Sequence, residues 1–336
     1  MPVRIEDVAR AAGVSTATVS RALRGLPSVS VETQQAVRQA AADLGYVVSR
    51  TASSLASGRT LTVGVVTPYV SRWYYATVIE AVERELRAVG YDALLVAVGE
   101  PPAGGAEPFR PEVLRGRVDG LVVLTAPLTG RELEDVRRLS VPITLVGASA
   151  PGAMSVRVDD LSIGRCATEH LLSLGHRKIA YIGGDPENHR NFAAPLDRRA
   201  GWLSALRAAG IEPLPSYADV SDFSAATGRS AAQRLLALPD RPTAVFAASD
   251  DIAFGVLSAA ADAGLEVPGQ LSVIGVDDHE LSEVLGLTTV AQPVSEQGRL
   301  AAQVVLAVIS GDLSRRHEDV LMDTTLVIRR TTGPPA

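Results

Sequence analysis

Short apolar runs alternate with amphipathic segments through most of this chain, and that alternation restricts the fold more than any other feature. The apolar runs predict strands at residues 61–66, 93–98, 120–124, 143–146, 179–182, 244–247 and 271–276. The segments between them predict helices at residues 76–89, 131–139, 162–174, 199–209, 225–237 and 252–263. Buried strands that alternate with helices form parallel sheets covered by helices on both faces. We therefore expect an α/β body, long enough for two doubly wound lobes.

The beginning of the chain follows a different pattern. Apolar side chains recur at helical spacing in residues 5–12 and 16–24, which predicts two short helices. Gly13 can take the left-handed conformation that ends the first helix, and Ser15 stands where an N-cap of the second belongs. This is the layout of a helix-turn-helix, whose second helix presents its N-terminal residues to base edges in the major groove of DNA.

The second helix has one apolar and one polar face. Val19, Ala22 and Leu23 would pack against the first helix. The outer face then carries the candidate DNA-reading residues, which are Thr16, Ala17, Ser20 and Arg21. An arginine can bind guanine with two hydrogen bonds, and an alanine can contact a thymine methyl. The alternative is a small helical hairpin with a solvated arginine.

A third helix is predicted from the cap Ser30 to Leu44, ended by Gly45. Its inward stripe would be Val37, Ala40, Ala41 and Leu44, with Tyr46 closing the small core. Residues 49–58 follow, rich in serine and alanine, and Leu55 is their only large apolar side chain. A helix this short needs a partner to be stable, so these residues are either a conditional helix or an ordinary linker.

Charge is distributed unevenly along the chain. Its net charge is −6, yet residues 1–60 contain seven arginines and four acidic residues, so the head is basic and the body acidic. A basic head on an acidic body is typical of a DNA-binding module joined to another function. The single cysteine, Cys166, allows no internal disulfide, and no apolar run predicts a membrane span or a signal peptide. We therefore expect a cytoplasmic protein without a membrane partner.

Polar and aromatic residues cluster where the predicted strands end, which is where open parallel sheets bind ligands. Three aromatic residues, Trp73, Tyr74 and Tyr75, follow the first strand in a chain that is only 4% aromatic. The other strand-end candidates are Arg198, Arg199, Asp222, Phe223, Ser249, Asp250, Asp277 and Asp278. Carboxylates, an arginine and aromatic faces suit a polyhydroxylated ligand. The alternatives are that Asp250 only caps the following helix and that Asp277 and Asp278 form a solvated turn.

Motifs for catalysis or cofactor binding are not found. The sequence contains no phosphate-binding P-loop and no dinucleotide fingerprint after the first strand. The five histidines show no metal-ligand spacing. We therefore expect a non-enzyme without cofactor or metal.

The head and hinge, IEDVARAAGVSTATVSRAL, VSVETQQAVRQAAADLGY and TASSLASGRT, resemble those of LacI/GalR-family transcriptional regulators. The similarity continues through the body in VDDLSIGRCATEHLLSLGHRKIAYIGG, DRRAGWLSALRAAGI, AVFAASDDIAFGVLSAAADAGLEVPGQLSVIGVDD and LTTVAQPVSEQGRLAAQVVL. It covers nearly the whole chain. One departure is the loop at residues 69–75, whose sequence YVSRWYY differs from the pattern common in the family.

The resemblance implies an all-α helix-turn-helix head at residues 1–48, a hinge helix at 49–59 and an effector-binding, dimerising body at 60–336. The body would be of periplasmic-binding-protein type, with one lobe at about 60–158 and 290–318 and the other at about 159–289 and 319–336. The chain would exchange lobes near Val158, near residues 287–293 and after Gly311. Leu55 would be the hinge leucine that wedges into the minor groove.

In the body, the resemblance places five residues in the effector site, which are Arg198, Phe223, Ser249, Asp277 and Gln292. We add Trp73 and Tyr74 as aromatic platforms for a sugar face. The expected function is a repressor that binds a palindromic DNA operator as a homodimer and is released by a sugar, including a di- or oligosaccharide. The alternative is the same architecture with a purine, nucleoside or other corepressor that promotes DNA binding. A plain solute-binding protein and an enzyme are the other classes, and both fit the sequence poorly.

Overall fold

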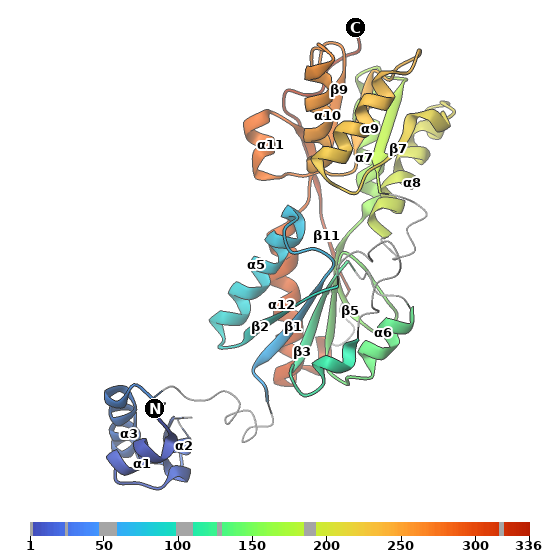
Figure 1. Cartoon of the computed structure of the whole chain (residues 1–336). Coiled ribbons are helices and arrows are strands. Elements are labelled where there is room, and N and C mark those ends of the chain that lie inside the picture. Colours follow the sequence, from blue (N-terminus) through green and yellow to red (C-terminus); the bar gives the residue numbers. More distant parts are fainter. Residues whose placement is uncertain are drawn as a thin grey trace. The chain divides into compact units, whose positions relative to one another are not determined.

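The computed structural model describes residues 3–23, 26–46, 59–98, 110–125, 130–184, 193–315 and 319–336 (Figure 1). The chain divides into two units, Met1–Thr60 and Leu61–Ala336, which are described separately below. Residues 49–58 of the predicted hinge, with Leu55 among them, lie outside the described residues.

In its described residues, the first unit contains three helices, α1 (Ile5–Ala11), α2 (Thr16–Leu23) and α3 (Val31–Leu44). Their ends are set by local sequence, as predicted. The Ser15 hydroxyl accepts a hydrogen bond from the Thr18 amide at 3.1 Å, and that of Ser30 accepts one from the Thr33 amide at 3.3 Å. Gly45 ends α3 with a φ of 66°, in the left-handed region that favours glycine.

A small apolar core joins these three helices. Val8, Val19, Ala22 and Val37 are fully buried, which confirms the predicted inner faces of α1 and α2. Tyr46 packs against this core. The prediction for Leu44 is wrong, since the side chain of this last residue of α3 is 38% exposed.

The second unit contains two lobes, each built on a six-stranded sheet. In the first lobe the strand order is β11-β5-β4-β3-β1-β2, and all neighbours are parallel. Its strands are β1 (Thr62–Thr67), β2 (Asp92–Ala97), β3 (Gly120–Leu124), β4 (Ile143–Val146), β5 (Met154–Val158) and β11 (Asp319–Met322). Its helices are α5 (Trp73–Ala88), α6 (Gly130–Arg137) and α12 (Val294–Ser310), with short 3₁₀ turns at Pro111–Leu114 and Leu313–Arg315.

The second lobe has the strand order β12-β10-β9-β8-β6-β7. Its strands are β6 (Ile179–Gly183), β7 (Ala218–Val220), β8 (Ala244–Ala247), β9 (Ser272–Asp277), β10 (Thr288–Ala291) and β12 (Thr325–Val327). Its helices are α7 (Asp160–Ser173), α8 (Ala193–Ala208), α9 (Ala225–Leu236), α10 (Asp250–Asp262) and α11 (Glu280–Leu285), with a 3₁₀ turn at Pro215–Tyr217. The predicted parallel sheet is confirmed, except that the edge strand β12 runs antiparallel to β10.

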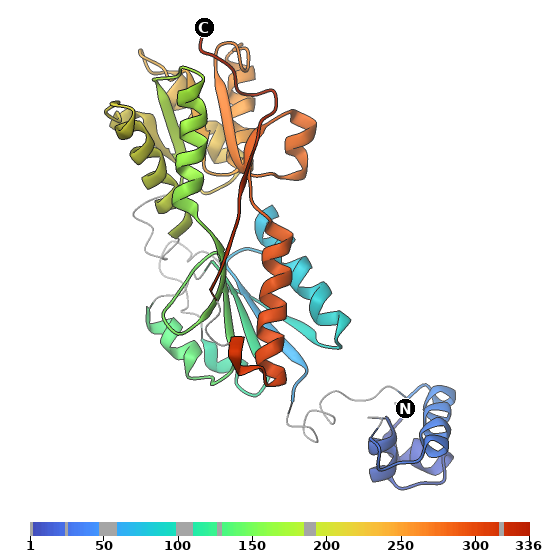
Figure 2. The ribbon, with the colours of Figure 1, turned by 180° about the vertical axis from the view of Figure 1, so that it is seen from behind.

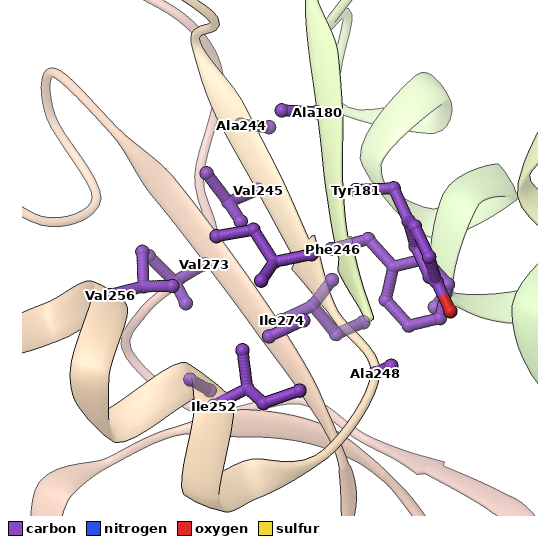
Figure 3. Packing of buried hydrophobic residues seen from close by; sticks show 14 of the residues in the cluster. Ala180, Tyr181, Ala244, Val245, Phe246, Ala248, Ile252, Val256, Val273 and Ile274 are labelled. Atoms are coloured by element: carbon purple, nitrogen blue, oxygen red, sulfur yellow. The ribbon is translucent and has the colours of Figure 1, made fainter. Parts of the chain in front are cut away.

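The core of the second lobe explains why the sequences of its strands are continuous apolar runs. Val245, Phe246, Val273 and Ile274 are fully buried in neighbouring central strands. Figure 3 shows Ile252 of α10 beside these strands, with further core side chains around it. Because helices cover the sheet, side chains on both faces of a central strand are apolar.

The chain passes between the lobes three times. The first passage joins β5 to α7 through Asp159, and the second joins β10 to α12. The third joins β11 to β12, and Figure 2 shows this C-terminal segment running from one lobe to the other. The third boundary is predicted at about residue 318, but β11 pairs with β5, so the boundary lies between Met322 and Thr325. β10 pairs with β9, so the second passage follows Ala291, within the predicted range of residues 287–293.

Glycines bring α7 and α8 into close approach. A Cβ atom on Gly164 would lie 2.1 Å from the Arg198 carbonyl oxygen, and one on Gly201 would lie 2.3 Å from the Leu161 carbonyl oxygen. Only glycine permits backbones this close at both positions. This approach places Arg198 of α8 beside Asp160 at the start of α7.

Candidate functional site

The outward face of α2 carries the residues predicted to read DNA. Thr16, Ala17 and Arg21 are exposed, and Ser20 is half-buried. Val19 and Ala22 are buried on the opposite side of the helix. An amphipathic second helix with a small polar outer face has the form that helix-turn-helix proteins place in the major groove.

A cavity of about 450 Å³ opens between the two lobes of the body. Its wall is built where strands of both sheets end. Thr125 follows β3, Gly147 follows β4, Gly184 follows β6, and Asp277 ends β9. The cavity therefore lies at the carboxyl edge of the strands, where the sequence predicted a ligand site.

Six of the seven predicted effector residues line this cavity, which are Tyr74, Arg198, Phe223, Ser249, Asp277 and Gln292. The seventh, Trp73, is not among the lining residues. Its ring packs instead against His279 of the other lobe, with ring centroids 4.7 Å apart. Trp73 thus joins the lobes beside the cavity.

Arg198 is the central charge of the cavity. It is 6% exposed; its Nε donates to Asp160 at 2.8 Å, and its Nη1 donates to the Ala248 carbonyl oxygen at 2.5 Å. The same Nη1 lies 4.0 Å from Asp277. Burial lowers the pKa of the Arg198 guanidinium, but Asp160 and Asp277 more than offset this, and the net shift is upward. A buried charge held in this way stays ionised.

Asp277 is a buried carboxyl group that accepts a hydrogen bond from Gln292. Burial raises its pKa to about 8, although Arg198 opposes the shift. Its φ is 121°, and two other lining residues, Thr125 and Phe223, also have left-handed φ values, of 51° and 66°. Such strained backbone often gathers at binding sites, where the surrounding structure holds it in place.

The raised pKa of Asp277 gives a pH prediction. The unfolded carboxyl group ionises near its ordinary pKa of 3.8, while the folded one keeps its proton to about pH 8. The contribution of Asp277 to stability therefore falls as pH rises from about 4 through 8. We expect Asp277→Asn to flatten the decline in Tm measured by calorimetry over this range. A decline as steep as that of the wild type would contradict the assignment.

A hydrogen-bond relay connects the lobes behind the cavity wall. Tyr74 donates its hydroxyl proton to Gln297 Oε1 at 2.9 Å, and Gln297 Nε2 donates to Gln292 Oε1 at 3.0 Å. Gln292 in turn donates to Asp277. Gln297 is fully buried on α12, and sequence reasoning missed it because a glutamine in an apolar helix gives no signal of its partner.

Arg72 forms a second link across the cleft. Its guanidinium lies 3.6 Å from the Tyr69 ring centre, and Nη1 donates to the Asp222 carbonyl oxygen. The Asp222 carboxylate is 3.8 Å from Nη2. Sequence reasoning did not assign Arg72, Tyr69 or Asp160 to the site, although the first two lie in the loop after the first strand that it singled out.

The alternative interpretation, that Asp250 only caps α10, is wrong. Ser249 is the cap of α10, accepting a hydrogen bond from the Ile252 amide at 3.3 Å. The buried Asp250 carboxylate instead accepts from the His279 amide and from the hydroxyls of Ser282 and Thr289. Asp250 therefore supports the cavity wall from behind.

Two further findings bear on function. Within the described residues, histidine, cysteine and acidic side chains form no cluster of three that could hold a metal ion. Over the same part of the chain, no helix combines the length and apolar character needed to cross a membrane.

Known families match both parts of the chain. Residues 4–49 match the family described as "Bacterial regulatory proteins, lacI family", and residues 168–332 match the "Periplasmic binding protein-like domain". The transcriptional regulator GalS of Salmonella typhimurium is 35% identical over 333 residues, covering 98% of this chain and 96% of GalS.

Solved structures agree with this. The lac repressor dimer bound to operator and the anti-inducer ONPF matches with a TM-score of 0.87 at 29% identity, covering 99% of this chain and all of that one. The regulator CelR in complex with cellobiose matches with a TM-score of 0.71 at 30% identity, covering 98% and 99% of the two chains. With a head and a body that both match over nearly their full length, this chain belongs to the LacI family and is a DNA-binding transcriptional repressor.

Proposed function

We propose that this repressor is released from DNA by a neutral sugar that binds in the cavity between its lobes. The observation that carries the proposal is the combination of aromatic faces and paired hydrogen-bonding groups in one cavity. Tyr69, Tyr74, Tyr75 and Phe223 supply the faces. Arg198 can donate to a hydroxyl oxygen, while Asp277 can accept from a neighbouring hydroxyl. A sugar has hydroxyl groups on adjacent carbons, one to accept from Arg198 and one to donate to Asp277. The C–H groups of its ring form the apolar face that packs on an aromatic side chain.

The size of the cavity suits this class of ligand. Its volume of about 450 Å³ falls within the range of roughly 300–1,000 Å³ that is usual for small-molecule sites. It has room for a monosaccharide or a disaccharide. The structural relative CelR was solved with cellobiose, which supports a carbohydrate here.

We infer that the chain acts as a homodimer whose two heads bind a palindromic operator, as in the lac repressor dimer bound to operator. A sugar that joins the lobes would change the spacing of the paired bodies and unfold the hinge at residues 49–59, withdrawing Leu55 from the minor groove. Complete reversal of DNA occupancy, from 1:99 to 99:1, requires about 5.5 kcal/mol of preference for one state. Two sites per dimer would share that requirement.

A thermal-shift screen of the full chain tests the proposal without knowledge of the operator. The probes are mono-, di- and oligosaccharides together with purines and nucleosides. A ligand at 100 times its Kd adds about 2.7 kcal/mol of stability. We expect a neutral sugar to raise the Tm. If only a purine or nucleoside raised it, the corepressor alternative would replace the sugar.

The head offers a separate prediction. Arg21→Ala is expected to relax base preference at one operator position by about 1–3 kcal/mol, because the arginine reads a base directly. Sequence selection from random DNA measures the preference of both proteins. Arg10→Ala removes the same charge from α1, where Arg10 pairs with Asp7, and should leave the preference unchanged. An unaltered profile for Arg21→Ala would remove its assigned role.

A further inference from the structure

The charges around the cavity are unevenly matched. Among the described residues, three arginines and four aspartates line it, which are Arg72, Arg198, Arg234, Asp160, Asp222, Asp251 and Asp277. Each of these arginines already has a carboxylate partner. Arg72 pairs with Asp222 at 3.8 Å, Arg198 with Asp160 at 2.8 Å, and Arg234 with Asp219 at 2.8 Å. Asp277 keeps its proton at neutral pH, so Asp251 is the carboxylate among these lining residues that has no arginine partner.

Two adjacent aspartates at the start of α10 differ in their surroundings. Asp250 is fully buried, and its two oxygens accept three hydrogen bonds. Asp251 is half-buried and lines the cavity, and its carboxylate makes no hydrogen bond or ion pair with any residue in the described part of the chain. The Asp250 carboxylate is therefore occupied by hydrogen bonds within the protein, whereas the Asp251 carboxylate is available to a ligand.

The environment of Asp251 resists its charge in the ligand-free protein. Burial raises the pKa of this carboxyl group, and the nearby His279 and Arg72 oppose the shift only in part. Neither of these two groups lies within ion-pair distance of it. A carboxylate removed from water without a partner costs free energy, which a hydrogen-bond donor on a ligand would recover.

The neighbouring side chains Tyr74 and Gln292 already donate hydrogen bonds to partners within the protein. Tyr74 has its hydroxyl proton engaged by Gln297, and the Gln292 amide donates to Asp277. What Tyr74 offers to a ligand is therefore a lone pair. Asp251 and Tyr74 therefore demand hydrogen-bond donors from the ligand, and Arg198 is the main donor that the wall provides in return.

We propose that Asp251 is a specificity-determining residue, which binds a hydroxyl or amino group at one end of the effector and makes the site reject phosphate esters. This rests on the proposed function of the cavity as a sugar site. A hydroxyl donates to the carboxylate and an ammonium group pairs with it. A phosphate offers neither, and brings a second negative charge beside Asp251.

Titration calorimetry on the full chain tests the selectivity. The probes are glucose, glucosamine, glucose 6-phosphate, ribose, ribose 5-phosphate, cellobiose and adenine. We expect a neutral or amino sugar to bind the wild type at least about tenfold more tightly than its phosphate ester. For Asp251→Asn, we expect binding of that sugar to weaken by about 10- to 100-fold, the usual loss for a charged hydrogen bond. Asp262→Asn is the matched control, because Asp262 ends the same helix and pairs with Arg229 outside the cavity.

A ligand-free measurement tests the same carboxylate independently. The Tm of wild type and Asp251→Asn is compared at pH 4.5 and 7.5. Since the folded pKa of Asp251 is raised, ionisation weakens the wild type as pH rises, and the asparagine does not titrate. The Tm of the variant minus that of the wild type should become more positive by about 2 °C at the higher pH.

The outcomes separate this proposal from the one on which it rests. If a sugar binds both proteins equally, or a phosphate ester binds the wild type as tightly as its parent sugar, the role of Asp251 is overturned while the sugar site stands. If adenine alone binds, the sugar proposal fails, and the affinity of Asp251→Asn for adenine decides the role of Asp251. If no probe binds, the ligand-free comparison decides it, since a constant Tm difference would show a carboxylate that is already satisfied.

Discussion

Replacing Arg198 by methionine is expected to abolish the thermal response to every ligand of the cavity and to lower the Tm by about 10 °C. The guanidinium is buried, bonds Asp160 and the Ala248 carbonyl oxygen, and lies near Asp277. Methionine fills much of the same volume without charge. Two carboxyl groups would then share a buried space with no cation, and breaking a buried ion pair on one side costs about 3–5 kcal/mol.

A second substitution separates the role of Arg198 in stability from its role in ligand binding. Adding Asp160→Asn removes one stranded carboxylate, so the double variant should recover part of the lost Tm but none of the ligand response. Arg229→Met is the control for charge, because Arg229 forms an exposed pair with Asp262 whose loss is worth at most about 1 kcal/mol. A ligand response retained by Arg198→Met would show that the effector binds elsewhere.

Asp250→Ala is expected to destabilise the body by about 4 kcal/mol without removing any group from the cavity wall. The buried carboxylate ties the start of α10 to α11 through His279 and Ser282 and to β10 through Thr289. Alanine would leave an amide and two hydroxyls without their acceptor. Chemical denaturation monitored by circular dichroism measures the change.

Gly275 offers an independent route to the same contact. A Cβ atom at this position would lie 2.1 Å from Asp250 Oδ1, so Gly275→Ala should also destabilise the body by displacing the carboxylate. Asp240→Ala removes an exposed partner of Lys178 and serves as the control. If Gly275→Ala proved as stable as the wild type, the carboxylate would not be held where the structure places it.

Local signals in the sequence predicted much of this molecule. The caps Ser15 and Ser30 and the terminating Gly45 each act within a few residues, so their roles follow from neighbours in the chain. The strands were predicted because central parallel strands are apolar on both faces. Helix starts were less accurate. The helix predicted from residue 76 begins at Trp73, since its aromatic first turn does not repeat the later apolar spacing.

Long-range partners were beyond what the sequence could predict. Asp250 and Asp251 are identical and adjacent, and only the placement of Ser282 and Thr289 gives the first a buried role and leaves the second facing the cavity. Trp73 and Tyr74 are similar neighbours, yet one packs on His279 and the other lines the cavity. Such distinctions depend on which residues the lobes bring together.

The central claim is that occupancy of the inter-lobe cavity controls DNA binding by the head. Fluorescence anisotropy of an operator fragment, selected from random DNA by the full chain, measures this directly while the sugar found by thermal shift is added. We predict release of the fragment from the wild type, with a midpoint at the sugar concentration that half-saturates the cavity, and no release from Arg198→Met. A sugar that saturates the wild-type cavity while the operator stays bound, or binds more tightly, would contradict it.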